Sequence, residues 1–260
     1  MTSFFKTITA VCLVASSGLQ SVAGGEPTYK WTAEDVTADA CLSVNLARNG
    51  KLPVHINDVA ADAELASSLK DILGDGEAQT ETTCEALIRE KEELLSAKHV
   101  FYHVIDSEGE RDYRQMLQAS LNAGLEVFKT KEYPKTEDGW KTVWGNKAGA
   151  NLAYLLSSNS TTVGCVIGKC TKEAGPEGKA GRNGVTTVEM TLLICDLDPP
   201  ATKDQAPFDE EYFTGLIART AKLADMTADD LKASNDAIAA AVFPTIISAS
   251  LLAMLTAAWA

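Results

Sequence analysis

Two histidines are spaced so that they could bind a metal ion together. His99 and His103 lie four residues apart in the segment HVFYHVI. Residues four apart on a strand share a face, and neutral imidazole is a common zinc ligand. Zinc needs a third protein ligand, and the remaining histidine, His55, has no E-x-x-H partner. We therefore expect both histidines to fill an aromatic strand, and we predict no metal and no cofactor.

Nucleophilic catalysis is not indicated either. A serine hydrolase would be expected to carry a positioned base and a nucleophile in a motif such as G-x-S-x-G, and the sequence has no such motif. A cysteine nucleophile needs an activating histidine nearby, and disulfide pairing accounts for most of the cysteines. The sequence therefore predicts no catalytic residues.

The cysteines predict a cross-linked extracellular domain. If residues 1–23 are a leader, as argued below, Cys12 is lost and five cysteines remain: Cys41, Cys84, Cys165, Cys170 and Cys195. Cys165 and Cys170 are five residues apart on a predicted strand, so they point to opposite faces, roughly 16 Å apart. That exceeds the ~7 Å between Cα atoms that a disulfide spans. Two bridges and one unpaired thiol are expected, and this reasoning leaves twelve pairings open.

A Gly-rich polar segment, GPEGKAGRNG, separates two runs rich in β-branched residues and predicts a long β-hairpin. Around this tip, three cations outnumber the acidic residues Glu173 and Glu177; the cations are Lys172, Lys179 and Arg182. Two interpretations stay open, a hairpin tip without further role and a contact loop.

Composition limits the class of protein. The 260 residues are 45% hydrophobic and carry 36 acidic against 23 basic side chains, a formal net charge of −13. A nucleic-acid-binding protein would show a net charge of the opposite sign and a basic stripe, so nucleic acid is excluded as a partner. We find no low-complexity linker and no repeat, and we expect one domain.

Both ends of the chain resemble targeting signals. Residues 1–23 hold one charge, Lys6, an apolar core and the small residues Ser21 and Ala23, which predict a signal peptide cleaved after Ala23. The apolar part is too short to span a bilayer.

At the C-terminus, residues 236–260 predict a glycosylphosphatidylinositol (GPI) signal that is removed. Residues 237–260 carry no charge, and the segment A-S-N-D at 233–236 offers small residues and a short spacer, so attachment at Ser234 or Asn235 is expected. The alternative is a transmembrane helix, which Pro244 and many Ala residues disfavour. The mature domain would be residues 24–235, on the outer leaflet of the plasma membrane at the cell surface.

In a secreted chain, the sequon Asn159-Ser160-Thr161 predicts N-glycosylation. The residue modified would be Asn159. Its use depends on its exposure and on the organism.

Apolar periodicity predicts helices over much of the chain. We expect them over residues 32–49, 57–74, 84–95, 113–128 and 213–223. Residues 129–144, which are polar and contain Pro134 and Gly139, are expected to be irregular, and residues 148–157 are ambiguous between helix and strand.

Strands are expected at 99–105, 162–170 and 185–195, forming a small antiparallel sheet. The fold class is therefore α+β, with helices on both faces of the sheet.

Two stretches resemble a known superfamily. SSNSTTVGCVIGKC and the strand ending ICDLDPP resemble the end of the CAP domain (cysteine-rich secretory, antigen 5 and pathogenesis-related proteins). SVNLARNGKLPVHINDVAADAELA resembles the opening of that domain, with its N-x-x-R element. The resemblance implies a three-layer α/β/α CAP-like sandwich. CAP proteins often carry a zinc cleft; Glu126 lies in a stretch that resembles one bearing a cleft Glu, but Asn151 stands near the position of the expected His.

With its leader, few cysteines and GPI signal, the whole chain is most similar to the GPI-anchored surface antigens (SAG proteins) of the coccidian parasite Eimeria. This resemblance implies the bridges Cys165–Cys195 and Cys84–Cys170, with Cys41 left as a free thiol. It implies a non-enzymatic antigen, bound to the membrane by its GPI lipid, that meets the host cell surface or host immune molecules. The alternatives are a CAP-type metal-dependent hydrolase and a lipid- or sterol-binding CAP protein.

Overall fold

The computed structural model of the chain describes residues 27–74, 83–105, 112–128, 132–173 and 186–232. Seven α-helices lie in these ranges: α1 (Ala38–Asn49), α2 (Ala63–Leu73), α3 (Cys84–Lys98), α4 (Tyr113–Leu125), α5 (Glu137–Trp144), α6 (Lys147–Leu155) and α7 (Glu210–Ala218). Two short 3-10 helices follow, η1 (Leu223–Asp225) and η2 (Ala228–Leu231). Among the described residues, no helix is both long and apolar enough to cross a membrane.

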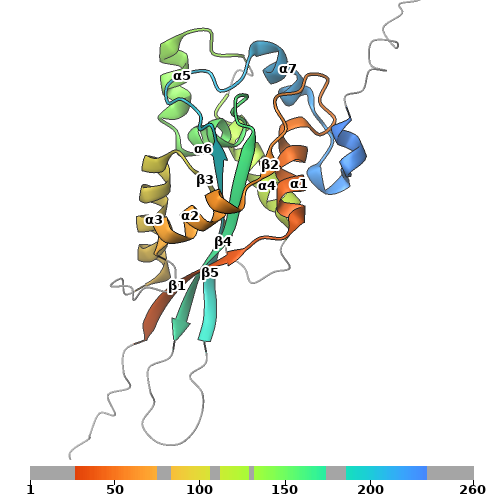
Figure 1. Ribbon diagram of the computed structural model, residues 1–260. Coiled ribbons are helices and arrows are strands. Elements are labelled where there is room, and N and C mark those ends of the chain that lie inside the picture. The colour runs from red at the N-terminus through yellow and green to blue at the C-terminus, as the bar shows by residue number, and fades with distance from the viewer. Residues whose placement is uncertain (1–26, 75–82, 106–111, 129–131, 174–185, 233–260) are drawn as a thin grey trace, which may run out of the picture.

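One mixed sheet forms the centre of the fold (Figure 1). Its antiparallel strands follow the order β1-β4-β5-β3, with β1 (Thr28–Asp35), β4 (Thr162–Glu173), β5 (Thr186–Asp198) and β3 (Phe101–Ile105). The two-residue β2 (Ala60–Ala61) pairs in parallel with the start of β4. The predicted α+β class and the long hairpin are confirmed, and β1 and β2 are additional strands that the sequence analysis missed.

Residues 32–35 were predicted to begin a helix, and this is wrong. They belong to β1, where Trp31 and Ala33 are buried while Lys30 and Asp35 are exposed. This alternation has the period of a strand, and it places Trp31 against β4. Helix α1 begins at Ala38, after the extended Thr37.

Helices pack against both faces of the sheet, and each face has its own core. On one face, Val166, Cys170 and Ile194 contact side chains of α2 and α3. On the other, Cys165, Ile167 and Leu193 belong to a larger cluster with α1, α4, α5, α6 and α7. Cys165 and Cys170 therefore point to opposite faces, as their spacing predicted.

Two segments differ from the predicted irregular or ambiguous structure. Residues 137–144 form α5, because Thr136 caps the helix by accepting a hydrogen bond from Gly139 N, and Trp140, Val143 and Trp144 are buried on one side. Residues 147–155 form α6, capped by Asn146. The second predicted helix begins at residue 63 rather than 57, since its cap is Asp62, whose carboxylate accepts from the N–H groups of the next turn.

Glycine lets the sheet and its neighbours approach closely. A Cβ on Gly164 would lie 2.4 Å from the backbone nitrogen of Ala66 at the start of α2. A Cβ on Gly168 would lie 2.2 Å from the ring of Trp31. The glycine of the V-G-C motif is thus needed for α2 to rest on β4.

The N-x-x-R element fixes the loop after α1. The Asn45 side chain forms hydrogen bonds with both N and O of Val59, at 2.8 Å each. Asn49 bonds both N and O of Ile56 in the same manner. Arg48 is fully buried, and its guanidinium donates to four backbone carbonyls, those of Asn57, Leu155, Ser157 and Ser160. These three side chains therefore join α1 to the segment before β2 and to the segment between α6 and β4.

Candidate functional site

The predicted contact loop lies at the end of a protruding part of the sheet. Residues 28–30, 171–173 and 186–188 of β1, β4 and β5 run beyond the helices at the lower end of Figure 1, and we call them the sheet extension. Lys172 lies here, with Nζ 3.5 Å from a carboxylate oxygen of Glu189 and 5.9 Å from the ring centre of Tyr29. The Glu189 charge raises the pKa of Lys172. Lys179 and Arg182 lie outside the described residues.

Two disulfides hold the hairpin, and they are the pairs that the resemblance implied. Cys165 and Cys195 face each other directly across β4 and β5, with 4.1 Å between their Cα atoms. Cys84, at the start of α3, is bonded to Cys170 on the other face of β4. One bridge therefore joins the two strands of the hairpin, and the other joins the hairpin to α3.

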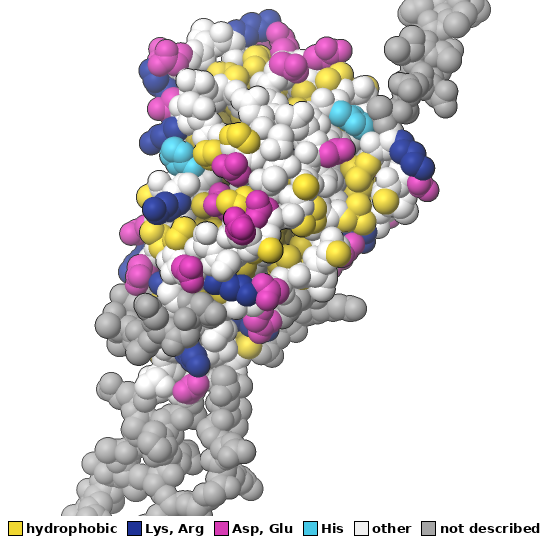
Figure 2. All heavy atoms as spheres, in the orientation of Figure 1, with side chains coloured by type: hydrophobic (Ala, Val, Ile, Leu, Met, Phe, Trp, Pro, Cys, Tyr) yellow, Lys and Arg dark blue, Asp and Glu magenta, His cyan; other side chains and the backbone are white. Residues whose placement is uncertain are grey.

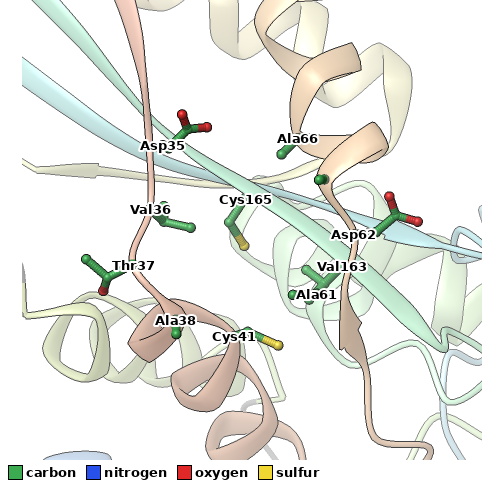
Figure 3. A pocket seen from close by; sticks show the side chains of 11 residues that line it. Asp35, Val36, Thr37, Ala38, Cys41, Ala61, Asp62, Ala66, Val163 and Cys165 are labelled. Atoms are coloured by element: carbon green, nitrogen blue, oxygen red, sulfur yellow. The ribbon is translucent and has the colours of Figure 1, made fainter.

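Cys41 is a free, half-buried thiol that lines a small cavity. The cavity has a volume of about 370 Å³, and Figure 3 shows Cys41 and Cys165 at its wall between α1, the start of α2 and β4. The thiol donates to the carbonyl of Val59 at 3.6 Å. Burial raises the pKa of Cys41, so the thiol stays protonated at neutral pH and is a weak nucleophile.

The histidines do not form a metal site. His99 was expected on a strand, and this is wrong: α3 continues to Lys98, and His99 ends the helix with φ of 62°. Its ring stacks on Tyr154 at 5.7 Å, whereas His103 lies on β3. His55 contacts the carbonyl of Leu52 at 3.1 Å. Within the described ranges, no three His, Cys, Asp or Glu side chains are grouped to hold a metal ion.

Asn151, which stands near the position of an expected cleft histidine, has a structural contact. It is buried in α6, and its carbonyl oxygen accepts from the backbone N–H of Tyr102 at 3.1 Å. Strand β3 is at the edge of the sheet, so this bond satisfies a donor that has no neighbouring strand. Glu126 is exposed at the end of α4.

The remaining predicted sites are placed as follows. Asn159 is exposed in the turn between α6 and β4, where its side chain is accessible. Ser234 and Asn235 lie outside the described residues, as do the signal peptide (1–23) and the C-terminal signal (236–260).

A groove that the sequence analysis missed lies between α3, β3 and the turn from α5 to α6. Its volume is about 520 Å³, and it is lined by aromatic rings, among them Tyr102, Trp144 and Tyr154, together with charged residues. These residues come from segments far apart in the chain, so no local motif indicates them.

The surface drawn in Figure 2 has no large apolar area. Hydrophobic side chains appear there in small groups between acidic and basic ones. Among the described residues, Ile72 is the one large hydrophobic side chain classed as exposed. An interface that depends on one broad hydrophobic patch is therefore not indicated on this face.

These features define a disulfide-bonded α+β domain whose long hairpin extends beyond its helical layers. The sequence model of the family described as "Sporozoite surface antigen (SAG) protein domain" matches residues 38–230. The chain therefore belongs to the SAG family of sporozoite surface antigens, and this membership places it at the parasite cell surface.

The chain is similar to the surface antigen protein SAG19 of Eimeria tenella, with 22% identity over 74% of this chain and 98% of that chain and a TM-score of 0.43. No curated protein matches the sequence.

Proposed function

We propose that the chain is a GPI-anchored parasite surface antigen, without enzymatic activity, that contacts host cells or host immune molecules through its sheet extension and the loop of residues 174–185. In this proposal residues 1–23 and 236–260 are removed, and residues 24–235 form the mature domain. The family membership and the uncharged C-terminal segment support it.

The observation that carries the proposal is that the last described helix and the sheet extension lie at different ends of the molecule. The last described helix, η2, packs beside α1 in the upper half of Figure 1, whereas the sheet extension lies at the lower end. Lys51 holds η2 through a hydrogen bond from its N–H to the carbonyl of Asp230, at 3.0 Å, and an ion pair of 3.6 Å with the same residue. An anchor at the C-terminal side would thus leave the sheet extension facing away from the membrane.

The expected attachment residues come soon after the last described residue. The described chain ends at Lys232, and the expected attachment residues, Ser234 and Asn235, come two and three positions later (234 − 232 and 235 − 232). A linker this short reaches roughly 10 Å when fully extended. The polypeptide part of the tether would therefore be short, which would restrict the range of orientations of the domain.

The arrangement of helices on both faces of the sheet supports a further, structural proposal. We infer a CAP-like three-layer sandwich, in which α2 and α3 form one helical layer and α1, α4 and α6 contribute to the other. The proposal rests on this layering and on the V-G-C and Pro-Pro motifs of the hairpin.

Treatment of intact cells with phosphatidylinositol-specific phospholipase C tests the anchor. We expect release of a species that ends at Ser234 or Asn235, identified by mass spectrometry. A chain with Ser234→Leu and Asn235→Leu is the matched control, because large residues impair the attachment site. Retention of the wild-type protein, or detection of Trp259 in it, contradicts the anchor.

Host contact is tested with a charge variant of the proposed contact surface. Replacing Lys172, Lys179 and Arg182 by Gln should lower binding of the purified protein to host cells about tenfold, measured by flow cytometry at physiological salt. A control variant replaces three other exposed cations, Lys98, Lys135 and Lys222, and has the same net charge. Equal binding by both variants contradicts a contact through the sheet extension.

A further inference from the structure

The groove between α3, β3 and α6 has a built aromatic floor. The rings of Tyr102, Trp144 and Tyr154 are 3 to 6% exposed and form its base. Polar contacts fix them: the Tyr102 hydroxyl pairs with the Ser96 hydroxyl at 3.2 Å, and the Tyr154 hydroxyl donates to the Ser96 carbonyl at 3.4 Å. The floor is therefore rigid and apolar, with polar groups at its edge.

His99 also lines this groove, and it is more exposed than the three rings of the floor. It is half-buried and stacks on Tyr154 with an angle of 15° between the rings, and its centroid lies 6.5 Å from that of Trp144. Its backbone has φ of 62°, a conformation that costs a residue with a Cβ on the order of 1 kcal/mol. A glycine or asparagine would suit this helix end better, so the histidine ring is a candidate binding element.

The charged side chains of the groove include two cations without an ion pair among the described residues. Lys147 is neutralised by Glu92, at 2.6 Å, and lies 5.3 Å above the ring centre of Tyr102. Arg89 and Lys203 also line the groove, and neither has an ion pair with any residue that the structure describes. Three cations against two carboxylates, Glu92 and Glu93, make the groove net positive on a chain of net charge −13.

We propose that this groove binds an anionic saccharide, a sugar that carries a carboxylate or a sulfate. The apolar C–H face of a sugar ring can pack on the His99 ring, and Arg89 and Lys203 can take its acid group through charge-assisted hydrogen bonds. Glu93 and the Ser96 hydroxyl are at hand for sugar hydroxyls. The groove is separate from the sheet extension, so this inference does not depend on the anchor or on the proposed host contact.

The test is saturation-transfer NMR on the chain purified from a secretory expression host. The probes are 3′-sialyllactose, a sulfated heparin disaccharide, and neutral lactose. At least one acidic sugar should bind, with transfer to its ring protons, and lactose should bind about tenfold more weakly. The two acidic probes distinguish a carboxylate-bearing glycan from a sulfated one.

Variants assign the binding to this groove. The exposed pair Arg89→Gln and Lys203→Gln should weaken binding about tenfold or more, whereas Lys98→Gln, on the same helix but outside the groove, should not change it. His99→Asn, which suits the backbone conformation, should remove the saturation transfer to the sugar face. Thermal unfolding checks that each variant is folded.

Three results would overturn the inference: no binding of either acid, equal binding of lactose, or unchanged binding by the Arg89/Lys203 double variant. If the hairpin variant of Lys172, Lys179 and Arg182 loses cell binding but still binds the sugar, the two proposals stand independently.

Discussion

Arg48 is a buried cation whose hydrogen-bond partners are neutral. Its guanidinium donates hydrogen bonds to four backbone carbonyls. Burial lowers the pKa of Arg48 to about 10, an effect opposed by the nearby Tyr212 and Asp58. With that pKa the side chain is charged at neutral pH. The planar fork of five N–H donors suits this shell, and a lysine cannot reproduce it. The N-x-x-R element is therefore explained by folding rather than by ligand binding.

Arg48→Met should lower the free energy of unfolding by about 3–5 kcal/mol, because it leaves several buried carbonyls without donors. Arg48→Lys should recover part of this loss. Urea unfolding with intact disulfides measures both, and exposed Arg89→Met should change stability by less than about 0.5 kcal/mol. A loss below about 1 kcal/mol for Arg48→Met would contradict the structural role.

Cys41 should react slowly with iodoacetamide at pH 7.5, more slowly than an unfolded cysteine. Burial raises its pKa, so the reactive thiolate is scarce at this pH and should increase as the pH rises above the ordinary pKa of about 8.5. Mass spectrometry follows the rate of labelling. In denaturant this rate should rise to that of an unfolded cysteine. Fast labelling at pH 7.5 would show that the thiol is not shielded.

At the scale of elements, the hairpin of β4 and β5 positions everything else. Outside the sheet extension both its faces are covered, α2 rests directly on Gly164, and the two disulfides fasten it on opposite sides. Chain-entropy estimates give about 4–5 kcal/mol for the Cys84–Cys170 bridge, because it closes a long loop, with a sequence separation of 86 residues. The shorter Cys165–Cys195 loop gives somewhat less.

Gly164→Ala should destabilise the fold by about 1–3 kcal/mol, because the added methyl group would overlap the backbone of α2. The control is Gly145→Ala, at an exposed helix end, where the new Cβ lies 3.2 Å from one carbonyl oxygen. Thermal unfolding should separate the two variants. Equal stability of both would contradict the close packing of α2 on β4.

Replacing Cys84 and Cys170 together by serine should remove about 4–5 kcal/mol of stability and loosen α3 from the sheet. Cys41→Ser is the matched control and should have little effect, since Cys41 forms no bridge. In this variant, backbone hydrogen exchange should become faster in α3 and change less in α4. Unchanged exchange in α3 would mean that packing alone holds this helix.

Sequence reasoning succeeded where a pattern was local. The hairpin was predictable from two β-branched runs and a Gly-rich tip, and the opposite faces of Cys165 and Cys170 follow from their spacing. It failed where tertiary contacts decide. The first strand resembled a capped helix, but the burial of Trp31 against Gly168 fixes it as β1. The cap at Thr136, three residues before Gly139, was the missed local signal of α5.

The candidate surfaces were less predictable than the fold. Lys172 was singled out by composition, but its pairing with Glu189 across the strands needed the register of β4 and β5. The aromatic groove combines Arg89 and His99 of α3 and its C-terminal end with Lys147 and Lys203 from two later segments, and no single segment carries a motif. Sequence reasoning placed His99 on a strand and so did not indicate that it lines the groove. In the structure, the left-handed end of α3 turns the His99 ring toward Tyr154.

At the scale of the whole molecule, η2 and the sheet extension lie at different ends. On a cell, an anchor near η2 would leave these two ends of the domain unequally exposed. An antibody against residues 174–185 should stain intact cells, whereas an antibody against residues 222–232 should stain them about tenfold less, because the proposed anchor would leave little room beneath the domain. Flow cytometry measures both, with solubilised protein as the control for antibody quality. Equal staining would contradict the proposed orientation.

The positions of the two disulfides also have a mechanical consequence. A force that pulls on the tip of the hairpin would load β4 and β5 along their length. The bridge from Cys170, three residues from Glu173, would hold β4 to α3, and the bridge between Cys165 and Cys195 would hold β5 to β4. A cell that adheres through this end could thus carry a tensile load while most of the domain stays folded.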